Sequence, residues 1–67
     1  MYGYTLFVYK KDRRCKSGEK LVNTYRYEGY SGHAMMDEIK HLYYSGLYSR
    51  NKFRLDFEAL AENTQFN

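Results

Sequence analysis

Three side chains, His33, Asp37 and His41, have the spacing of a possible metal site. Each follows the previous one by four residues, so on a helix they lie in one row. Imidazole and carboxylate in such a row are ligands for a divalent metal. The same spacing also fits the solvent side of an amphipathic helix, where rows of polar residues are the norm. We therefore expect no metal and no cofactor.

The sequence also lacks a pattern for covalent or phosphate-transfer chemistry. Neither histidine accompanies a nucleophile with a third, orienting group. Ser17-Gly18 and Ser31-Gly32 are turn pairs and not a glycine-rich phosphate loop. The single cysteine, Cys15, lies in a basic stretch that favours a reactive thiolate, but an ordinary loop cysteine is the simpler interpretation. We predict a protein that is not an enzyme.

Positive charge is concentrated in residues 10–20. The chain has a formal net charge of +3, and this segment alone contains six basic and two acidic residues, a net of +4. Such a patch attracts phosphates or acidic proteins, although a solvated hairpin tip has the same composition. The basic residues of the segment that we expect to bind a partner are Lys10, Lys11, Arg13, Arg14 and Lys16.

Aromatic residues are abundant, with nine tyrosines and four phenylalanines among 67 residues. Tyrosine combines a large apolar ring with a polar tip and is enriched in contact surfaces. A domain of this length buries only about 60% of the surface that its unfolded chain exposes. Some rings therefore have to face outward, which favours contact with another molecule.

The first part of the chain has the pattern of a β-hairpin. Residues 2–10 and 21–27 are rich in aromatic and β-branched residues, and the charged residues between them end in a turn signal. We expect Val8 to lie opposite Leu21. This register places Leu21 on the same face of the sheet as Val8.

The second part predicts a helix and a third strand. Residues 33–44 have amphipathic spacing, with Ser31 as the N-cap and Gly46 just beyond the end. Phe53, Leu55 and Phe57 then alternate with charged residues, which indicates a strand with one buried and one charged face.

These elements predict a single α+β domain over residues 1–67 with the order β-β-α-β. The third strand pairs antiparallel with the first, which gives a three-stranded antiparallel or mixed sheet in the order 2-1-3. The helix packs on one face through a right-handed crossover. Residues 59–67 form a short helical turn or fray.

The sheet face opposite the helix is the second candidate surface. Aromatic rings flanked by arginine and lysine stack unpaired bases in several small folds, and the same residue types are enriched in protein interfaces. A protein-binding or dimer surface is the first interpretation of this face, a single-stranded nucleic-acid-binding surface the second and an inert aromatic face the third. For the whole chain, a self-associating structural subunit is the third hypothesis. The residues expected on this face are Phe7, Tyr9, Val22, Arg26, Lys52 and Arg54.

The opening Met1-Tyr2-Gly3-Tyr4-Thr5-Leu6-Phe7-Val8-Tyr9-Lys10, followed by Asp12-Arg13-Arg14 and Lys16-Ser17-Gly18-Glu19, resembles small uncharacterised accessory proteins of phages that infect cyanobacteria. The similarity covers mainly the first hairpin. The resemblance implies a short, non-enzymatic protein that binds a host protein and modulates it.

The chain's length and composition also predict its oligomeric state, its compartment and the kind of partner that it binds. A small core without an internal disulfide favours support from a partner, and an exposed edge strand can pair with another chain, so we expect a homo-oligomer. No apolar run is long enough to span a membrane and the N-terminus lacks a signal-peptide pattern. We expect a cytoplasmic protein, in the host cytoplasm if it is viral, whose partner is an acidic protein surface.

Overall fold

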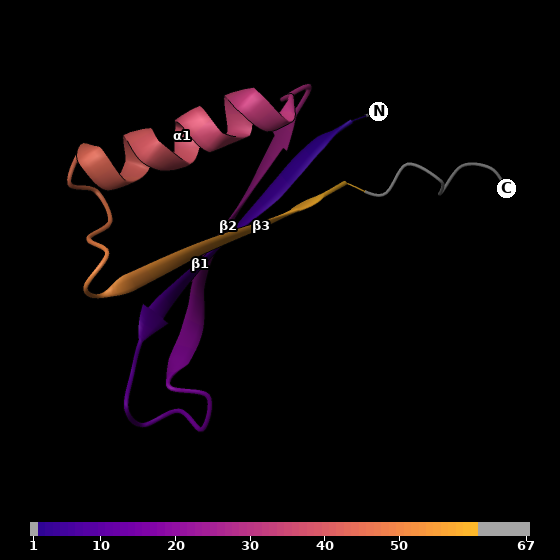
Figure 1. The fold of residues 1–67 in the computed structure, drawn as a ribbon. Helices are drawn as coiled ribbons and strands as arrows, with labels where there is room; N and C mark the ends of the chain where they lie inside the picture. Colours follow the sequence, from indigo (N-terminus) through magenta and orange to yellow (C-terminus); the bar gives the residue numbers. More distant parts are fainter. Residues whose placement is uncertain (1, 61–67) are drawn as a thin grey trace, which may run out of the picture.

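The computed structural model describes residues 2–60, which form a β-β-α-β arrangement (Figure 1). Strands β1 (Gly3–Lys11) and β2 (Glu19–Glu28) form a hairpin, helix α1 (Gly32–Tyr44) follows, and β3 (Phe53–Ala59) is the last element. The sheet order is β2-β1-β3, and β1 pairs antiparallel with both neighbours. The predicted α+β fold and strand order are confirmed.

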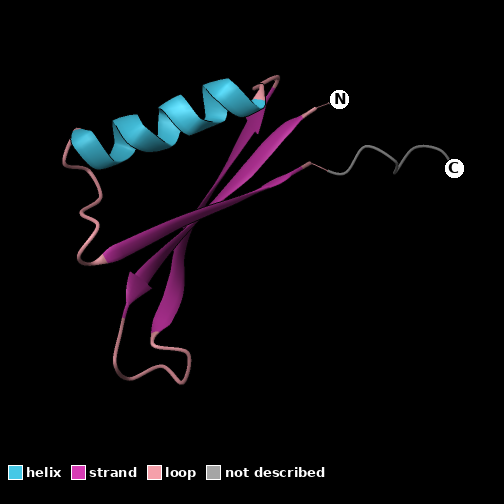
Figure 2. Ribbon diagram, in the orientation of Figure 1, coloured by secondary structure: helices cyan, strands magenta, loops and turns pink. Residues whose placement is uncertain are grey.

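Helix α1 lies over one face of the twisted sheet, whereas the loop between β1 and β2 extends away from the helix (Figure 2). The hairpin end of the sheet therefore projects beyond the part that the helix covers. Helix α1, the one helix within residues 2–60, is not long and apolar enough to cross a membrane. Ala59, predicted to begin a tail, ends β3 instead. Residues 61–67 of the predicted tail lie outside the described residues.

The hairpin register differs from the predicted one by two residues. Val8 lies opposite Asn23, and after an irregularity Tyr9 lies opposite Leu21, which leaves Val22 as an extra residue in β2. A shift by an even number keeps the later residues of β2 on their predicted faces. The bulge, however, moves Leu21 to the face of Tyr9, so the expected position of Leu21 beside Val8 is wrong.

Helix α1 begins and ends at the predicted signals. The Ser31 hydroxyl accepts a hydrogen bond from the Ala34 N–H at 3.2 Å, as an N-cap does. Gly46 has a φ of +86° and donates its N–H to the Tyr43 carbonyl at 3.2 Å. A left-handed residue at this position stops the helix at little cost when it is glycine.

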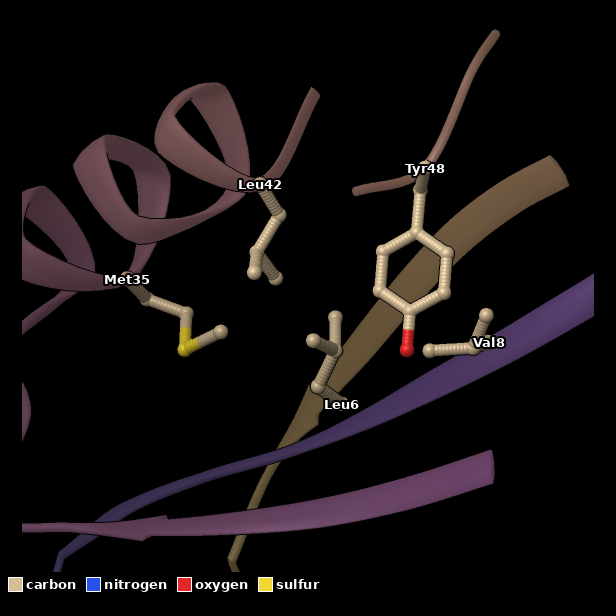
Figure 3. Packing of buried hydrophobic residues seen from close by; sticks show 5 residues of the cluster. All are labelled: Leu6, Val8, Met35, Leu42 and Tyr48. Carbon is tan, nitrogen blue, oxygen red and sulfur yellow. The ribbon is translucent and has the colours of Figure 1, made fainter. Parts of the chain in front are cut away.

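The core lies between the covered face of the sheet and α1 (Figure 3). Leu6 and Val8 of β1 and Met35 of α1 are fully buried, and Leu42 and Tyr48 join them. Ile39 and the predicted buried residues Phe53, Leu55 and Phe57 pack around this cluster and are half-buried.

Tyrosine hydroxyls at the border of the core form hydrogen bonds with other polar side chains. Tyr25 and Tyr48 share a hydrogen bond of 2.9 Å between their hydroxyls, and Asn23 donates its side-chain N–H to Tyr25 at 2.8 Å. Tyr27 donates to Glu38 of α1 at 3.3 Å. Burial, together with the charge of Glu38, raises the pKa of Tyr27 to about 12. The Tyr27 hydroxyl therefore stays protonated at neutral pH and donates a hydrogen bond to the helix.

Leu6→Ala is expected to destabilise the fold by about 2–5 kcal/mol, because it removes a fully buried side chain from the centre of a small core. The free energy of unfolding in urea measures this change. Leu47→Ala is the control, since Leu47 is 61% exposed and a surface change of this kind alters stability by only about 0.5 kcal/mol. Equal effects of the two substitutions would contradict the core assignment.

Candidate partner-binding surface

The loop between β1 and β2 is held by consecutive turns. The Asp12 N–H donates to the Gly18 carbonyl at 2.8 Å, Cys15 to Asp12 at 3.1 Å, and Gly18 to Cys15 at 3.0 Å. The Asp12 carboxylate also accepts the backbone N–H of Arg14 at 2.9 Å, which is the arrangement by which aspartate stabilises a turn. The loop residues are thus displayed on a defined backbone, with Cys15 half-buried within it.

Most basic residues of the surface of residues 10–20, here called the basic tip, form no ion pair within residues 2–60, although, after the hydrogen bonds of Arg14, the charges of Lys20 and Lys10 also help to lower the pKa of Asp12. Its two acids are held by arginines: Asp12 pairs with Arg14 at 3.2 Å, and Glu19 pairs with Arg54 of β3 at 2.6 Å. The hydrogen bond from Arg14 lowers the pKa of Asp12 below its usual value. Within residues 2–60, no ion pair holds Lys10, Lys11, Arg13, Lys16 or Lys20.

Two of these lysines lie directly across the ladder from each other. Lys10 of β1 is paired with Lys20 of β2, and both are exposed. Side chains at opposed positions of an antiparallel pair are close neighbours, and like charges there repel. The Asp12 carboxylate offsets part of this repulsion because, after the hydrogen bonds of Arg14, the charges of both lysines help to lower its pKa.

On the sheet face opposite the helix, Arg54 covers Tyr9. The Arg54 guanidinium carbon lies 4.4 Å from the centre of the Tyr9 ring, and the same guanidinium donates to both carboxylate oxygens of Glu19. Arg54 therefore joins β3 to β2 across β1. The Tyr9 ring, predicted as a contact surface, is instead one side of an internal arginine contact.

The rest of this face carries acids as well as the predicted basic residues. Phe7 is half-buried opposite Asp56, and Thr5 lies between Arg26 and Glu58. Arg26 pairs with Glu28 at 2.7 Å, so both predicted arginines of the face are engaged by carboxylates.

Lys52 precedes β3, where its carbonyl accepts the Lys11 N–H at 2.9 Å, and its side chain is exposed. The predicted partner-binding residues thus form two adjoining surfaces. On the face of Phe7 and Tyr9 both arginines are paired with carboxylates, and Lys52 is in no ion pair within residues 2–60; in the basic tip, Arg14 is paired and the other basic residues are not.

Three backbone N–H groups on the outer edge of β3 already donate hydrogen bonds. The Leu55 N–H donates to the Tyr43 hydroxyl at 3.1 Å, the Phe53 N–H to the Ser49 carbonyl at 2.9 Å, and the Phe57 N–H to the Asp56 carboxylate at 2.9 Å. Unpaired edge donors are the template for strand addition. This edge is therefore poorly suited to pairing with another chain.

Neither the weak metal pattern nor a pocket adds a chemical site. His33, Asp37 and His41 are exposed on α1, and the part of the chain from 2 to 60 contains no group of three or more potential ligands able to hold a metal. A pocket of about 370 Å³ lies where β1 begins, α1 begins and β3 ends. Among residues 2–60 its lining includes Tyr2, Tyr4 and Tyr30 but no charged, imidazole or thiol side chain.

Two parts of this surface were not found from the sequence. The Glu19–Arg54 pair joins residues whose proximity depends on the registers of both strand pairs, so no local pattern signals it. The position of Leu21 on the face of Tyr9 depends on the bulge, for which the sequence offers no glycine or other local sign.

No protein-family model, curated protein or solved structure matches this chain.

Arg54→Gln is expected to raise the pKa of Glu19 towards that of an ordinary carboxyl, because the Arg54 hydrogen bonds are the largest cause of its lowering. Since the folded-state pKa of Glu19 is the lower one, its stabilising contribution is present above the unfolded-state pKa and is lost as the pH falls through the folded-state value. An NMR titration of the Glu19 carboxyl carbon measures the pKa. Arg26→Gln is the matched control because Arg26 pairs with Glu28. A Glu19 pKa that stays low in Arg54→Gln would show that the bridge does not form.

Proposed function

We propose that this chain is a non-enzymatic binding module that contacts an acidic protein surface through the basic tip. In the setting that the resemblance to phage proteins implies, the partner is a host protein, and binding modulates its activity in the host cytoplasm. The observation that carries the proposal is the uneven pairing of charge. Both acids of the tip are held by arginines, while its lysines and Arg13 have no ion pair within residues 2–60.

The backbone of the tip supports this function because it is ordered before a partner arrives. Consecutive turns fix the positions of Arg13 and Lys16, so less conformational freedom is lost on binding. The tip also projects beyond the helix (Figure 1). A concentrated charge in such a position steers an oppositely charged partner and raises the association rate.

Single-stranded nucleic acid is the alternative partner, and the sheet face supports it less well. Base stacking needs an accessible aromatic ring, and Arg54 covers the Tyr9 ring. A nucleic-acid backbone also needs unpaired basic residues, whereas Arg26 and Arg54 are bound to carboxylates. Asp56 and Glu58 on the same face would repel phosphate.

The test is affinity capture from an extract of the natural host, with and without nuclease treatment, with the protein immobilised through its C-terminus. The comparison is between the unchanged protein and the variant Arg13→Gln/Lys16→Gln/Lys20→Gln. We expect the unchanged protein to retain a host protein with an acidic surface and the variant to lose it, with an association rate lower by roughly tenfold or more. Both proteins should melt at nearly the same temperature, because exposed charges contribute little to stability.

Lys40→Gln is the matched control, since Lys40 is an exposed lysine of α1 away from the tip. Its capture should equal that of the unchanged protein. Equal capture by the triple variant would refute the role of the tip. A bound component that disappears after nuclease treatment, and whose binding is lost in Tyr9→Ala, would replace the proposal with the nucleic-acid alternative.

A further inference from the structure

The side of α1 that faces away from the sheet carries two exposed apolar side chains. Tyr44 is 78% exposed and Met36 is 46% exposed. Lys40, also exposed, lies four residues from each of them, so the three side chains form one row on the helix. Figure 1 shows the sheet on the other side of α1. Single exposed apolar residues are common on protein surfaces, so the charges beside the row have to identify a partner.

The charges on this side of α1 are arranged so that the helix complements itself. Asp37 is exposed one turn before Lys40, and neither residue is held in an ion pair within residues 2–60. The acid lies nearer the start of the helix and the base nearer its end. A second α1 that runs in the opposite direction therefore presents Lys40 to Asp37 and Asp37 to Lys40.

An antiparallel pair of α1 helices with a twofold axis at Lys40 matches the whole row, and each contact occurs twice. Met36 of one copy lies level with Tyr44 of the other, because both are four residues from the axis. A methionine thioether packs favourably against an aromatic ring. Lys40 lies about 4.5 Å along the helix axis from Asp37 of the other copy, which is the rise of three residues. A lysine side chain spans this offset.

Other partners fit the row less well. A nucleic acid would bring phosphate groups against Asp37, which repels them. A membrane surface binds a helix with a broad apolar face bordered by basic residues, whereas this side of α1 combines two apolar residues with an acid and a base. The alternation of charge along the helix therefore favours a second copy of the chain.

We propose that the outer side of α1 is a dimer interface, in which Met36 and Lys40 of one copy contact Tyr44 and Asp37 of a second copy. A contact made by one helix of each copy buries less than the ~1,200 Å² of a standard interface, so the dimer is weak and reversible. The loop of the basic tip extends away from α1 (Figure 2). Formation or loss of the dimer therefore leaves the contacts of a single tip unchanged, and the inference is independent of the proposed function.

Exchange of the two charges tests this arrangement in sedimentation equilibrium. Asp37→Lys places two bases against each other across the interface, and Lys40→Asp places two acids together. For each variant alone, the dissociation constant of the dimer should rise by about tenfold or more, because two attractive pairs become repulsive. An equimolar mixture of the two variants should form a heterodimer about as stable as the unchanged dimer, since every base then meets an acid. A change within a single helix cannot produce this rescue.

Tyr44→Ala tests the apolar contact and should also weaken the dimer by about tenfold, because it removes the ring that covers Met36. Tyr2→Ala is its control, since Tyr2 is another exposed tyrosine outside α1. Glu58→Lys and Lys16→Asp make the same changes of net charge as the two charge variants, at exposed positions outside α1. All three controls should leave the dissociation constant unchanged. Circular dichroism melting confirms that each variant is folded.

The remaining outcomes would each overturn the inference. They are a protein that stays monomeric up to about 1 mM, a dimer that the charge variants leave unchanged, and variants whose mixture does not associate. Weakening by Glu58→Lys or Lys16→Asp as large as that by the α1 variants would assign the effect to net charge and would overturn the inference too. None of these results bears on capture of a partner by the tip, so the proposed function would still stand.

Discussion

One guanidinium, that of Arg54, organises the exposed side of the sheet. It extends from β3 over the Tyr9 ring of β1 and binds Glu19 of β2 with a shortest distance of 2.6 Å. All three strands therefore meet in one contact on the side that the helix does not cover. The same contact withdraws an acid from the basic tip, so the cohesion of the sheet and the charge of its free end depend on the same pair.

The tip and the core are separate parts of the molecule. The core is formed where α1 covers Leu6 and Val8, and the tip lies beyond this region (Figure 2). Its backbone is held by its own turns and by the Asp12 carboxylate. The basic residues of the tip that form no ion pair can therefore change without a large effect on the fold, because they take no part in the buried cluster. A small domain can use such a projecting loop for binding while its few buried residues maintain the structure.

Much of the fold could be predicted because its signals are local. The strict alternation at Phe53, Leu55 and Phe57 predicts β3, and Ser31 and Gly46 mark the two ends of α1. The strand order follows because β1 is the strand with apolar residues on both faces and is therefore central. These features depend on neighbouring residues and on the helix and strand periods, both of which are visible in a sequence.

The details of the surface could not be predicted, because they depend on register. The hairpin loop is closed by turns that shift the pairing by two residues, and the bulge at Val22 then moves Leu21 to the other face. The charge of the tip was predicted from composition. Whether Glu19 can neutralise part of this positive charge depends on Arg54, a residue distant in the sequence. Aromatic content likewise indicated a contact face but not that Arg54 would cover Tyr9.

The central claim is that the protein binds its partner with the tip of the hairpin and not with the aromatic face of the sheet. Two-dimensional ¹H–¹⁵N NMR spectra of this protein, recorded while the captured acidic partner is added, test this claim most directly. We predict that the amide signals that shift belong to residues 10–20. Shifts centred on Thr5, Phe7 and Asp56, with the tip unchanged, would contradict it and return the binding site to the sheet face.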